Sequence, residues 1–210
     1  MTNIIESQHD LEHGIAALSK TEPRFADIVR RTGLPPLRRR AEPLAGLLHI
    51  IVSQQLSKAS AEAIWRRLEQ SAAPFDPAAL LGRDDGDFRA VGLSRPKVRT
   101  IRSLCAALVG GELDLADLAR HDDDSVHERL TVVKGIGPWT ADIYLLSCLG
   151  RADAWPAGDL ALQVALCHAF GLAERPGRAG MVHHAAPWRP WRAIAARLLW
   201  SWYAIRNEPE

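Results

Sequence analysis

Residues 130–141 read LTVVKGIGPWTA and decide the fold of this chain. One apolar run ends at Gly135-Ile136-Gly137, and a second apolar run starts at once with Trp139. The two glycines permit positive φ and leave backbone N–H groups uncovered by side chains. Because the second segment begins beside them, its unpaired N-terminal amides point the same way. The pattern predicts a helix–hairpin–helix turn that offers N–H donors to an anion such as phosphate. A tight helix–helix connection packed for its own sake is the alternative.

Apolar residues recur at helical spacing along most of the chain, and no stretch reads as a convincing strand. Strong helical patterns cover residues 44–54 and 94–108, with Lys97 off the apolar face of the latter. Ser57 is placed to N-cap a helix, and the last helix is expected to open at Pro187. The sum is about ten helices, so the sequence predicts an all-α fold. A chain of 210 residues can form one large domain or two small ones that share a cleft.

The composition narrows the class of protein. The hydrophobic content of 47% is ordinary for a packed globule, and the net charge of +1 by itself indicates no partner. Any nucleic-acid surface must therefore come from local clustering of basic residues. The three cysteines form no C-x-x-C pair and read as small buried hydrophobes, which suits a reducing cytoplasm. No signal peptide or membrane-spanning run is found, so we expect a soluble, cytoplasmic protein.

Asp159 is the candidate catalytic residue. It directly precedes an apolar helical pattern, where aspartate is a routine N-cap, and this alone could explain it. N-capping keeps a carboxylate ionised because it accepts backbone N–H bonds. An ionised carboxylate near a phosphate-binding turn suggests one chemistry. When a glycosidic bond breaks, positive charge develops on the sugar, and a carboxylate stabilises that charge and can orient water.

Aromatic residues give a second indication. The chain has seven tryptophans, and four lie near the elements just described: Trp139, Trp155, Trp188 and Trp200. Tryptophan at helical spacing is usually core, yet a flipped base also needs flat apolar walls on which to stack. An alkylated, positively charged base would gain cation–π attraction as well. The pair His183-His184 has no further ligand at metal-binding spacing, so no metal site is expected there.

These pieces together resemble the helix–hairpin–helix DNA glycosylase superfamily and, within it, the bacterial 3-methyladenine-DNA glycosylase II group. The match spans about residues 22–203, and its segments occur in family order. The matching segments are residues 52–57 (VSQQLS), 92–94 (GLS), 134–141 (KGIGPWTA), Asp159, and 187–192 (PWRPWR) through Trp200. No segment of the 210 residues corresponds to the extra N-terminal β-rich domain of the best-known members, so we expect the chain to resemble a shorter, all-helical subgroup.

The resemblance implies roles for individual residues. Asp159 falls on the catalytic aspartate, and Trp139 and Trp200 fall on aromatics of the base pocket. Gly135 and Gly137 fall on the hairpin amides that hold DNA phosphate, and Lys134 is expected to face phosphate rather than substrate. Two further sets are implied. The loop that fills the gap left by the flipped nucleotide corresponds to Gln54, Gln55 and Leu56, with the wedge side chain left open. The backbone carbonyls that bind a structural monovalent cation in relatives correspond to Thr131, Val133 and Ile136.

The resemblance also implies a reaction subclass. Relatives that cleave the DNA strand carry a nucleophilic lysine where this chain has Trp139, and an indole cannot form a Schiff base. The expectation is a monofunctional glycosylase that uses water, with no catalytic cofactor, acting as a monomer on double-stranded DNA. Its expected substrates are 3-methyladenine and 7-methylguanine. Ile143, where some members have a pocket tyrosine, suggests a wider pocket. Deaminated, etheno or mismatched bases remain an alternative, as does a non-catalytic module that binds damaged DNA.

The expected architecture has two helical lobes with the active cleft between them. A terminal lobe would combine residues 1–53 with 150–210. A central lobe, residues 54–149, would hold the helix–hairpin–helix at 131–142.

Overall fold

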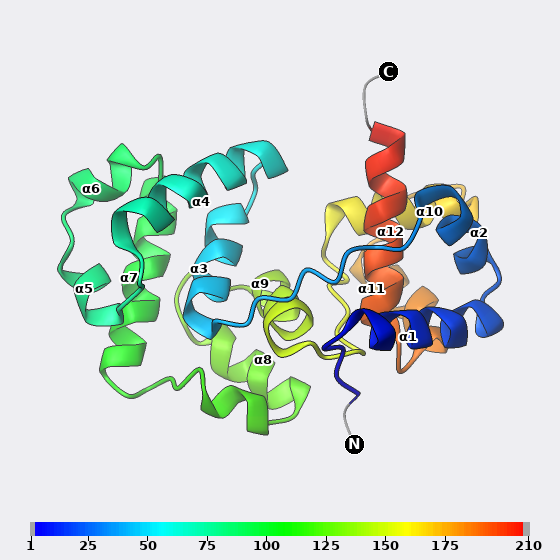
Figure 1. The fold of residues 1–210 in the computed structure, drawn as a ribbon, viewed down its shortest axis with the longest axis horizontal. Helices are drawn as coiled ribbons and strands as arrows, with labels where there is room; N and C mark the ends of the chain where they lie inside the picture. The colour runs from blue at the N-terminus through cyan, green and yellow to red at the C-terminus, as the bar shows by residue number, and fades with distance from the viewer. Residues whose placement is uncertain (1–2, 208–210) are drawn as a thin grey trace. The chain divides into compact units, whose positions relative to one another are not determined.

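The computed structural model describes residues 3–207, so the outermost ends of the expected terminal lobe lie outside the described residues. The regular elements of the described chain are helices (Figure 1), which confirms the all-α prediction. Its one β-type pairing is an isolated antiparallel bridge between Ile4 and Arg151. None of the described helices combines the length and the apolar character needed to cross a membrane.

Contacts divide the chain into two units. Unit 1 combines the residues up to Arg39 with those from Leu145 onward, and unit 2 is Arg40–Tyr144. These boundaries differ from the expected lobes, which separated at residues 53/54 and 149/150. The first difference arises because the helix before residue 54 packs on helices of unit 2. The second arises because the helical pattern after Trp139 runs without a break in the sequence across the boundary at Leu145.

Unit 2 is built around an almost wholly apolar helix, α3. The helices of this unit are α3 (Pro43–Ser53), α4 (Lys58–Ala72), α5 (Pro77–Gly82), α6 (Asp85–Ala90), α7 (Arg95–Val109), the 3-10 helix η1 (Asp117–Arg120), α8 (Asp123–Thr131) and α9 (Pro138–Tyr144). Helices α4, α7 and α9 pack against α3, and α5 packs on α7. Leu47, Leu48 and Ile51 of α3 are fully buried, so this helix supplies the centre of the core.

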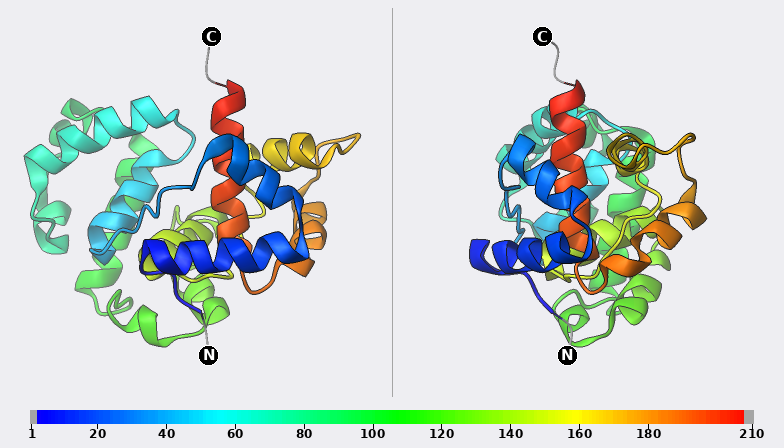
Figure 2. Two further views of the ribbon diagram at one scale, coloured as in Figure 1. Left: turned by 45° about the vertical axis from the view of Figure 1, so that its right-hand side comes forward. Right: turned by 90° about the vertical axis from the view of Figure 1, so that its right-hand side faces the viewer.

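Unit 1 is organised around the last helix, α12 (Figures 1 and 2). Its helices are α1 (Gln8–Thr21), α2 (Arg24–Thr32), the π-helix η2 (Leu145–Leu149), α10 (Leu160–Phe170), α11 (Arg178–Ala185), the 3-10 helix η3 (Ala186–Trp188) and α12 (Arg192–Asn207). Helices α1, α2 and α10 pack on α12, whose residues Ala193–Ala196 are buried.

Two helix ends test the sequence predictions. The last long helix begins at Arg192 rather than at Pro187, because Pro187 and Pro190 lack the amide hydrogens that a continuous helix needs. Ser57 caps α4 as predicted, its Oγ accepting from the Ser60 amide at 3.3 Å. Cys105 and Cys148 are buried cysteines that form no disulfide, and burial raises the pKa of Cys105 to about 11.

Candidate functional site

The predicted hairpin is present in unit 2 between α8 and α9. Of its two glycines only Gly135 has positive φ, at +94°, and a Cβ atom there would collide with the side chain of Thr100. Both backbone conformation and space therefore exclude a side chain at Gly135. At Gly137 a Cβ atom would meet nothing within 4 Å, so the missing side chain simply leaves the backbone open.

The apolar run before the turn is divided between core and surface. Leu130 and Val133 are buried and hold the turn on the unit, as does Ile136. Val132 is 85% exposed, although in the sequence it looks like its buried neighbours. Lys134 is exposed beside it. The hairpin therefore presents an exposed valine, a lysine and open backbone on one turn, and nothing in the local pattern distinguished Val132 from a core residue.

The three carbonyls implied as cation ligands flank the same turn. The Val133 carbonyl accepts from the Ile136 amide at 3.0 Å, which leaves its second lone pair for another partner. Among the described residues no group of three or more His, Cys, Asp or Glu side chains could hold a metal. Backbone oxygens are hard donors, which suit a hard cation rather than a transition metal. A cation held by Thr131, Val133 and Ile136 stays a prediction.

The turn after α3 is tied to the hairpin by one side chain. Gln54 Nε2 donates to Thr140 Oγ1 at 2.9 Å and to the Gly135 carbonyl at 3.3 Å. Gln55 follows with φ at +55°, and Leu56 is 40% exposed. The three residues therefore divide into an anchor, Gln54, and two exposed side chains that are available to contact a ligand.

Lys97 is a buried residue that sequence reasoning misplaced on the outer face of its helix. Its Nζ donates to the Val52 carbonyl at 2.5 Å, near the C-terminus of α3. A cation is favourable there because the helix dipole places negative charge at that end. Burial lowers the pKa of this lysine. Its position depends on the packing of α7 on α3, for which the one-dimensional pattern carries no signal.

The carboxylate site lies in unit 1, at the N-terminus of α10. Asp159 is half-buried and caps this helix, its Oδ1 accepting from the Leu162 amide at 2.9 Å. The same oxygen accepts from the indole Nε1 of Trp200 on α12 at 3.2 Å. The next residue, Leu160, is 59% exposed, so a carboxylate and an uncovered apolar side chain meet at this helix end. Trp200 thus orients the acid from a helix distant in the sequence.

The tryptophans predicted near the site separate into two groups. Trp155 and Trp188 are buried in an aromatic cluster with 5.6 Å between their ring centroids, and Trp155 Nε1 donates to the Met181 carbonyl. These two are core residues. Trp139 on α9 and Trp200 on α12 are half-buried and keep part of each ring open.

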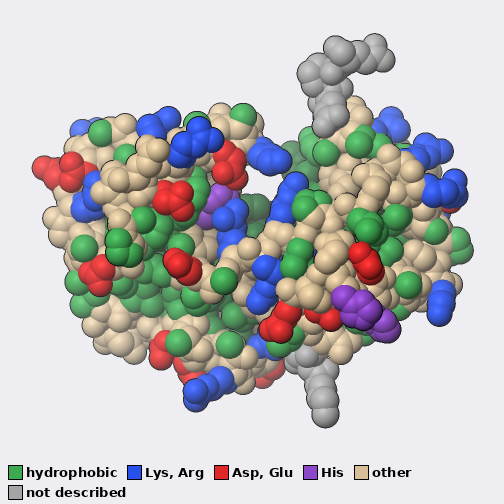
Figure 3. Space-filling view, in the orientation of Figure 1, with side chains coloured by type: hydrophobic (Ala, Val, Ile, Leu, Met, Phe, Trp, Pro, Cys, Tyr) green, Lys and Arg blue, Asp and Glu red, His purple; other side chains and the backbone are tan. Residues whose placement is uncertain are grey.

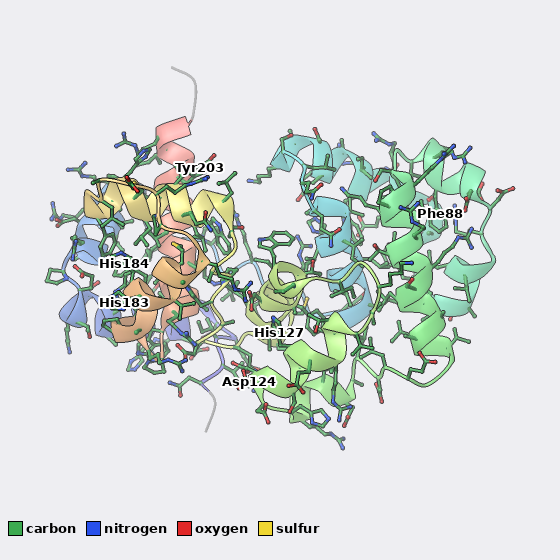
Figure 4. All side chains as sticks on the ribbon, turned by 180° about the vertical axis from the view of Figure 1, so that it is seen from behind. Phe88, Asp124, His127, His183, His184 and Tyr203 are labelled. Atoms are coloured by element: carbon green, nitrogen blue, oxygen red, sulfur yellow. The ribbon has the colours of Figure 1, made fainter. Side chains whose placement is uncertain are left out.

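The structure therefore brings the predicted residues together in two sets. Unit 2 holds the hairpin with Gln54–Leu56 and Trp139, and unit 1 holds Asp159 with Trp200. His183 and His184 lie apart from Asp159 in sequence, on α11, with ring centroids 6.0 Å apart (Figure 4).

Comparison with known proteins finds one matching family, together with proteins of similar sequence and similar structure. The family described as "HhH-GPD superfamily base excision DNA repair protein" matches residues 48–190. The "DNA-3-methyladenine glycosylase 1" of Schizosaccharomyces pombe is 28% identical over 201 residues, which are 94% of this chain and 88% of that protein.

Two solved structures are similar over nearly the whole chain. A DNA-3-methyladenine glycosidase from Bacillus halodurans is 30% identical with a TM-score of 0.76, over 97% of this chain and 92% of that one. An S. pombe 3-methyladenine DNA glycosylase in complex with abasic DNA is 26% identical with a TM-score of 0.86, over 94% of this chain and 100% of that one.

Proposed function

The chain belongs to the HhH-GPD superfamily of base excision DNA repair proteins, and from this premise we propose that it is a monofunctional glycosylase that releases alkylated purines from double-stranded DNA. The observation that carries the proposal is the half-buried Asp159 carboxylate held by Leu162 and Trp200. The named likenesses to 3-methyladenine glycosylases over most of the chain support this substrate class.

The reaction needs charge stabilisation more than acid catalysis. In a 3-methyladenine or 7-methylguanine nucleotide the base already carries a positive charge. When the C1′–N bond breaks, the base takes the bonding electrons and departs as a neutral molecule. The positive charge that remains develops on the sugar, where the ionised Asp159 carboxylate stabilises it. Water then adds to C1′ and loses a proton, which leaves an abasic site and a free base.

The indole of Trp200 prepares the carboxylate for this role. By donating to Oδ1 at 3.2 Å it fixes one oxygen, as the Leu162 amide does. A carboxylate held in this way needs little reorganisation when charge appears on the sugar. The exposed part of the Trp200 ring, like that of Trp139, is a surface on which a flipped base stacks.

Hydrolysis without strand cleavage follows from the residue on the hairpin. A β-lyase reaction requires an amine that attacks C1′ and forms a Schiff base, and the indole of Trp139 has no such nucleophile. Lys134 instead offers its charge at the exposed turn, beside the open backbone at Gly137. Those groups bind a DNA phosphate, and Gln55 or Leu56 enters the gap left by the flipped nucleotide. A cation on the carbonyls of Thr131, Val133 and Ile136 would add positive charge at the phosphate.

Two assays on the wild-type protein test the proposal. Purified protein is incubated with duplex DNA treated with a methylating agent, and released bases are identified by chromatography. We expect 3-methyladenine and 7-methylguanine to appear. Preferential release of hypoxanthine, uracil or ethenoadenine would move the substrate to deaminated or etheno bases, and release of no base would leave a non-catalytic binding module. Borohydride should trap no covalent protein–DNA complex, and a trapped complex would contradict the hydrolytic mechanism.

A further inference from the structure

Four arginines surround one surface hollow in unit 2, and none of the residues proposed for the hairpin or the carboxylate site lines it. The hollow has a volume of about 210 Å³, and α6 and α7 form its walls. Its lining residues are Asp85, Arg89, Arg95, Val98, Arg99 and Arg102. Over the part of unit 2 that is visible in Figure 3, basic and acidic side chains are interspersed. The hollow itself is lined by four arginines and one aspartate.

The acid that lines the hollow is already used. Arg102 Nη2 donates to Asp85 at 2.8 Å, and the same guanidinium donates to the carbonyls of Leu81 and Arg83. It also lies 5.6 Å from the ring centroid of the buried Phe88 of α6 (Figure 4). Arg102 is therefore a structural member of the wall, and its ion pair with Asp85 has no net charge, so the net positive charge of the hollow comes from the other three arginines.

The other three arginines have no acidic partner among the described residues. Arg89, Arg95 and Arg99 are exposed, and no ion pair within 4.0 Å is found for any of them. Asp87 is the other acidic residue of α6 that has a basic neighbour. Its Oδ2 lies 4.0 Å from Nε of Arg83, which does not line the hollow. Like charges gathered around a hollow repel one another unless an anion lies between them.

The local helix geometry adds to this charge. Arg95 is the first residue of α7, whose first turn contains no acid and whose N-cap, Ser94, makes no side-chain capping bond. A cation at a helix N-terminus opposes the helix dipole, whereas an anion there is favourable. The arrangement therefore costs stability in the free protein, and an anion that binds the guanidinium groups would relieve this cost.

We infer that this arginine hollow, formed by Arg89, Arg95 and Arg99 with Arg102 in its wall, binds a backbone phosphate of the DNA outside the segment held by the hairpin. Guanidinium groups match the oxygens of a phosphate in paired hydrogen bonds. A volume of about 210 Å³ suits a single phosphate group and lies below the roughly 300 Å³ at which small-molecule pockets begin. An exposed site of this size gains affinity from a polyanion, because each neutralised phosphate releases counterions.

Helix α7 connects the hollow to the hairpin and thereby supports DNA as the ligand. Thr100 of α7 is the residue that a Cβ on Gly135 would strike, so the hairpin rests directly on this helix. Arg95 and Thr100 are separated by about 7.5 Å along the helix axis and lie about 140° apart around it. The two phosphate sites thus share helix α7 within unit 2 but lie on different sides of it. The inference rests on the proposed function only in taking DNA as the ligand, and it does not require that the protein release bases.

The test is the salt dependence of DNA binding. The variant Arg95→Gln/Arg99→Gln removes two exposed, mutually repelling charges that make no ion pair in the fold, so it should unfold at or slightly above the temperature of the wild type. The dissociation constant for an undamaged duplex is measured by fluorescence anisotropy over a tenfold range of NaCl. Loss of one phosphate contact should lower the slope of log Kd against log salt by about 1. The ratio of the variant's Kd to that of the wild type should therefore fall about tenfold from the lowest to the highest salt concentration.

A matched control separates a site from general charge loss. The variant Arg66→Gln/Arg120→Gln removes two exposed arginines of the same unit that lie outside the hollow, and its slope should equal that of the wild type. An equal loss of slope in both double variants would overturn the inference, as would an unchanged slope for Arg95→Gln/Arg99→Gln. Arg89→Gln alone provides a second, independent variant with the same expectation.

The outcomes also separate this inference from the proposed function. If the wild type releases methylated bases and the slope is unchanged, the hollow alone is wrong. If no base is released and the slope still falls, the DNA site stands and the catalytic proposal fails. A site for free phosphate would leave the slope unchanged and would show instead as thermal protection by inorganic phosphate that the double variant loses, which overturns the DNA assignment.

Discussion

Asp122 and Asp159 begin two helices by the same local device, but their surroundings differ. Asp122 Oδ1 accepts from the amide three residues later at 2.8 Å, and Asp159 Oδ1 does the same at 2.9 Å. The second bond to the Asp122 side chain comes from Ser125, within the same turn, and this carboxylate is exposed. Asp159 is half-buried, and its second donor, Trp200, comes from a different helix. A capping carboxylate therefore becomes a candidate for chemistry when tertiary packing adds a partner and a partly closed environment.

The strongest way to break this comparison is to remove the charge from each aspartate in turn. Asparagine caps a helix about as well as aspartate, so Asp159→Asn and Asp122→Asn should both fold with near wild-type stability. We expect Asp159→Asn to slow base release by about a thousandfold, since charge stabilisation of this kind is worth roughly 10²–10³ in rate or more. The measurement is single-turnover release from methylated DNA with protein in excess.

The paired variant makes this result specific. Asp122→Asn should release bases at the rate of the wild type, because its carboxylate makes only local bonds within α8. The comparison fails if the two variants lose activity alike, and the catalytic assignment fails if Asp159→Asn retains a rate within a few-fold of the wild type while it still binds DNA.

The partner of the carboxylate should have the next largest effect. Trp200→Phe keeps a ring but removes the N–H that donates to Asp159, and a hydrogen bond to a charged group contributes about 1.5–3 kcal/mol. We expect kcat to fall about tenfold to a hundredfold, with little change in KM for methylated duplex. Trp155→Phe is the matched control, since it loses a bond to the Met181 carbonyl in the core. That variant should lose stability and keep kcat. A raised KM with unchanged kcat in Trp200→Phe would show that the ring only binds the base.

The same contrast explains what the sequence could and could not predict. The hairpin was predictable because it depends on a local property of the chain: Gly135 adopts a positive φ at a position where no side chain fits. Asp159 was predictable as an N-cap whose carboxylate could stabilise charge on a sugar, but its bond to Trp200 was not, because that bond depends on how α10 packs on α12. Lys97 was misplaced for the same reason: the carbonyl it contacts belongs to another helix. The unit boundary at Leu145 coincides with the change from α9 to the π-helix η2, a change that an uninterrupted apolar pattern does not reveal.

The two glycines of the hairpin test whether its proposed phosphate site depends on backbone conformation, in contrast to the site at Asp159, which depends on a side chain. Gly135→Ala must adopt φ near +94° and meet Thr100, so we expect it to lower the free energy of unfolding by about 1–3 kcal/mol and to weaken DNA binding. Gly137→Ala meets nothing within 4 Å and has no positive φ, so its stability should stay near that of the wild type. Urea unfolding and binding to undamaged duplex measure the two effects. Equal destabilisation by both substitutions would contradict the conformational account of the turn.

The smallest expected effect isolates the capping role of Asp122 from any role in chemistry. Hydrogen bonds from the backbone and side chain of Ser125 hold the pKa of this carboxyl below its ordinary value of 3.8. A group whose pKa is lower in the folded state stabilises that state when the pH is above its unfolded pKa, and this contribution is lost as the pH falls through the folded pKa. Asp122→Asn has no such proton to bind, so its thermal midpoint should fall less than that of the wild type between pH 7 and pH values below about 3.9. Base release at pH 7 should not distinguish the two proteins. An identical acid dependence of stability would mean that Asp122 is not held in the folded state as the structure shows, and the two N-caps would then differ even in the local bond that they share.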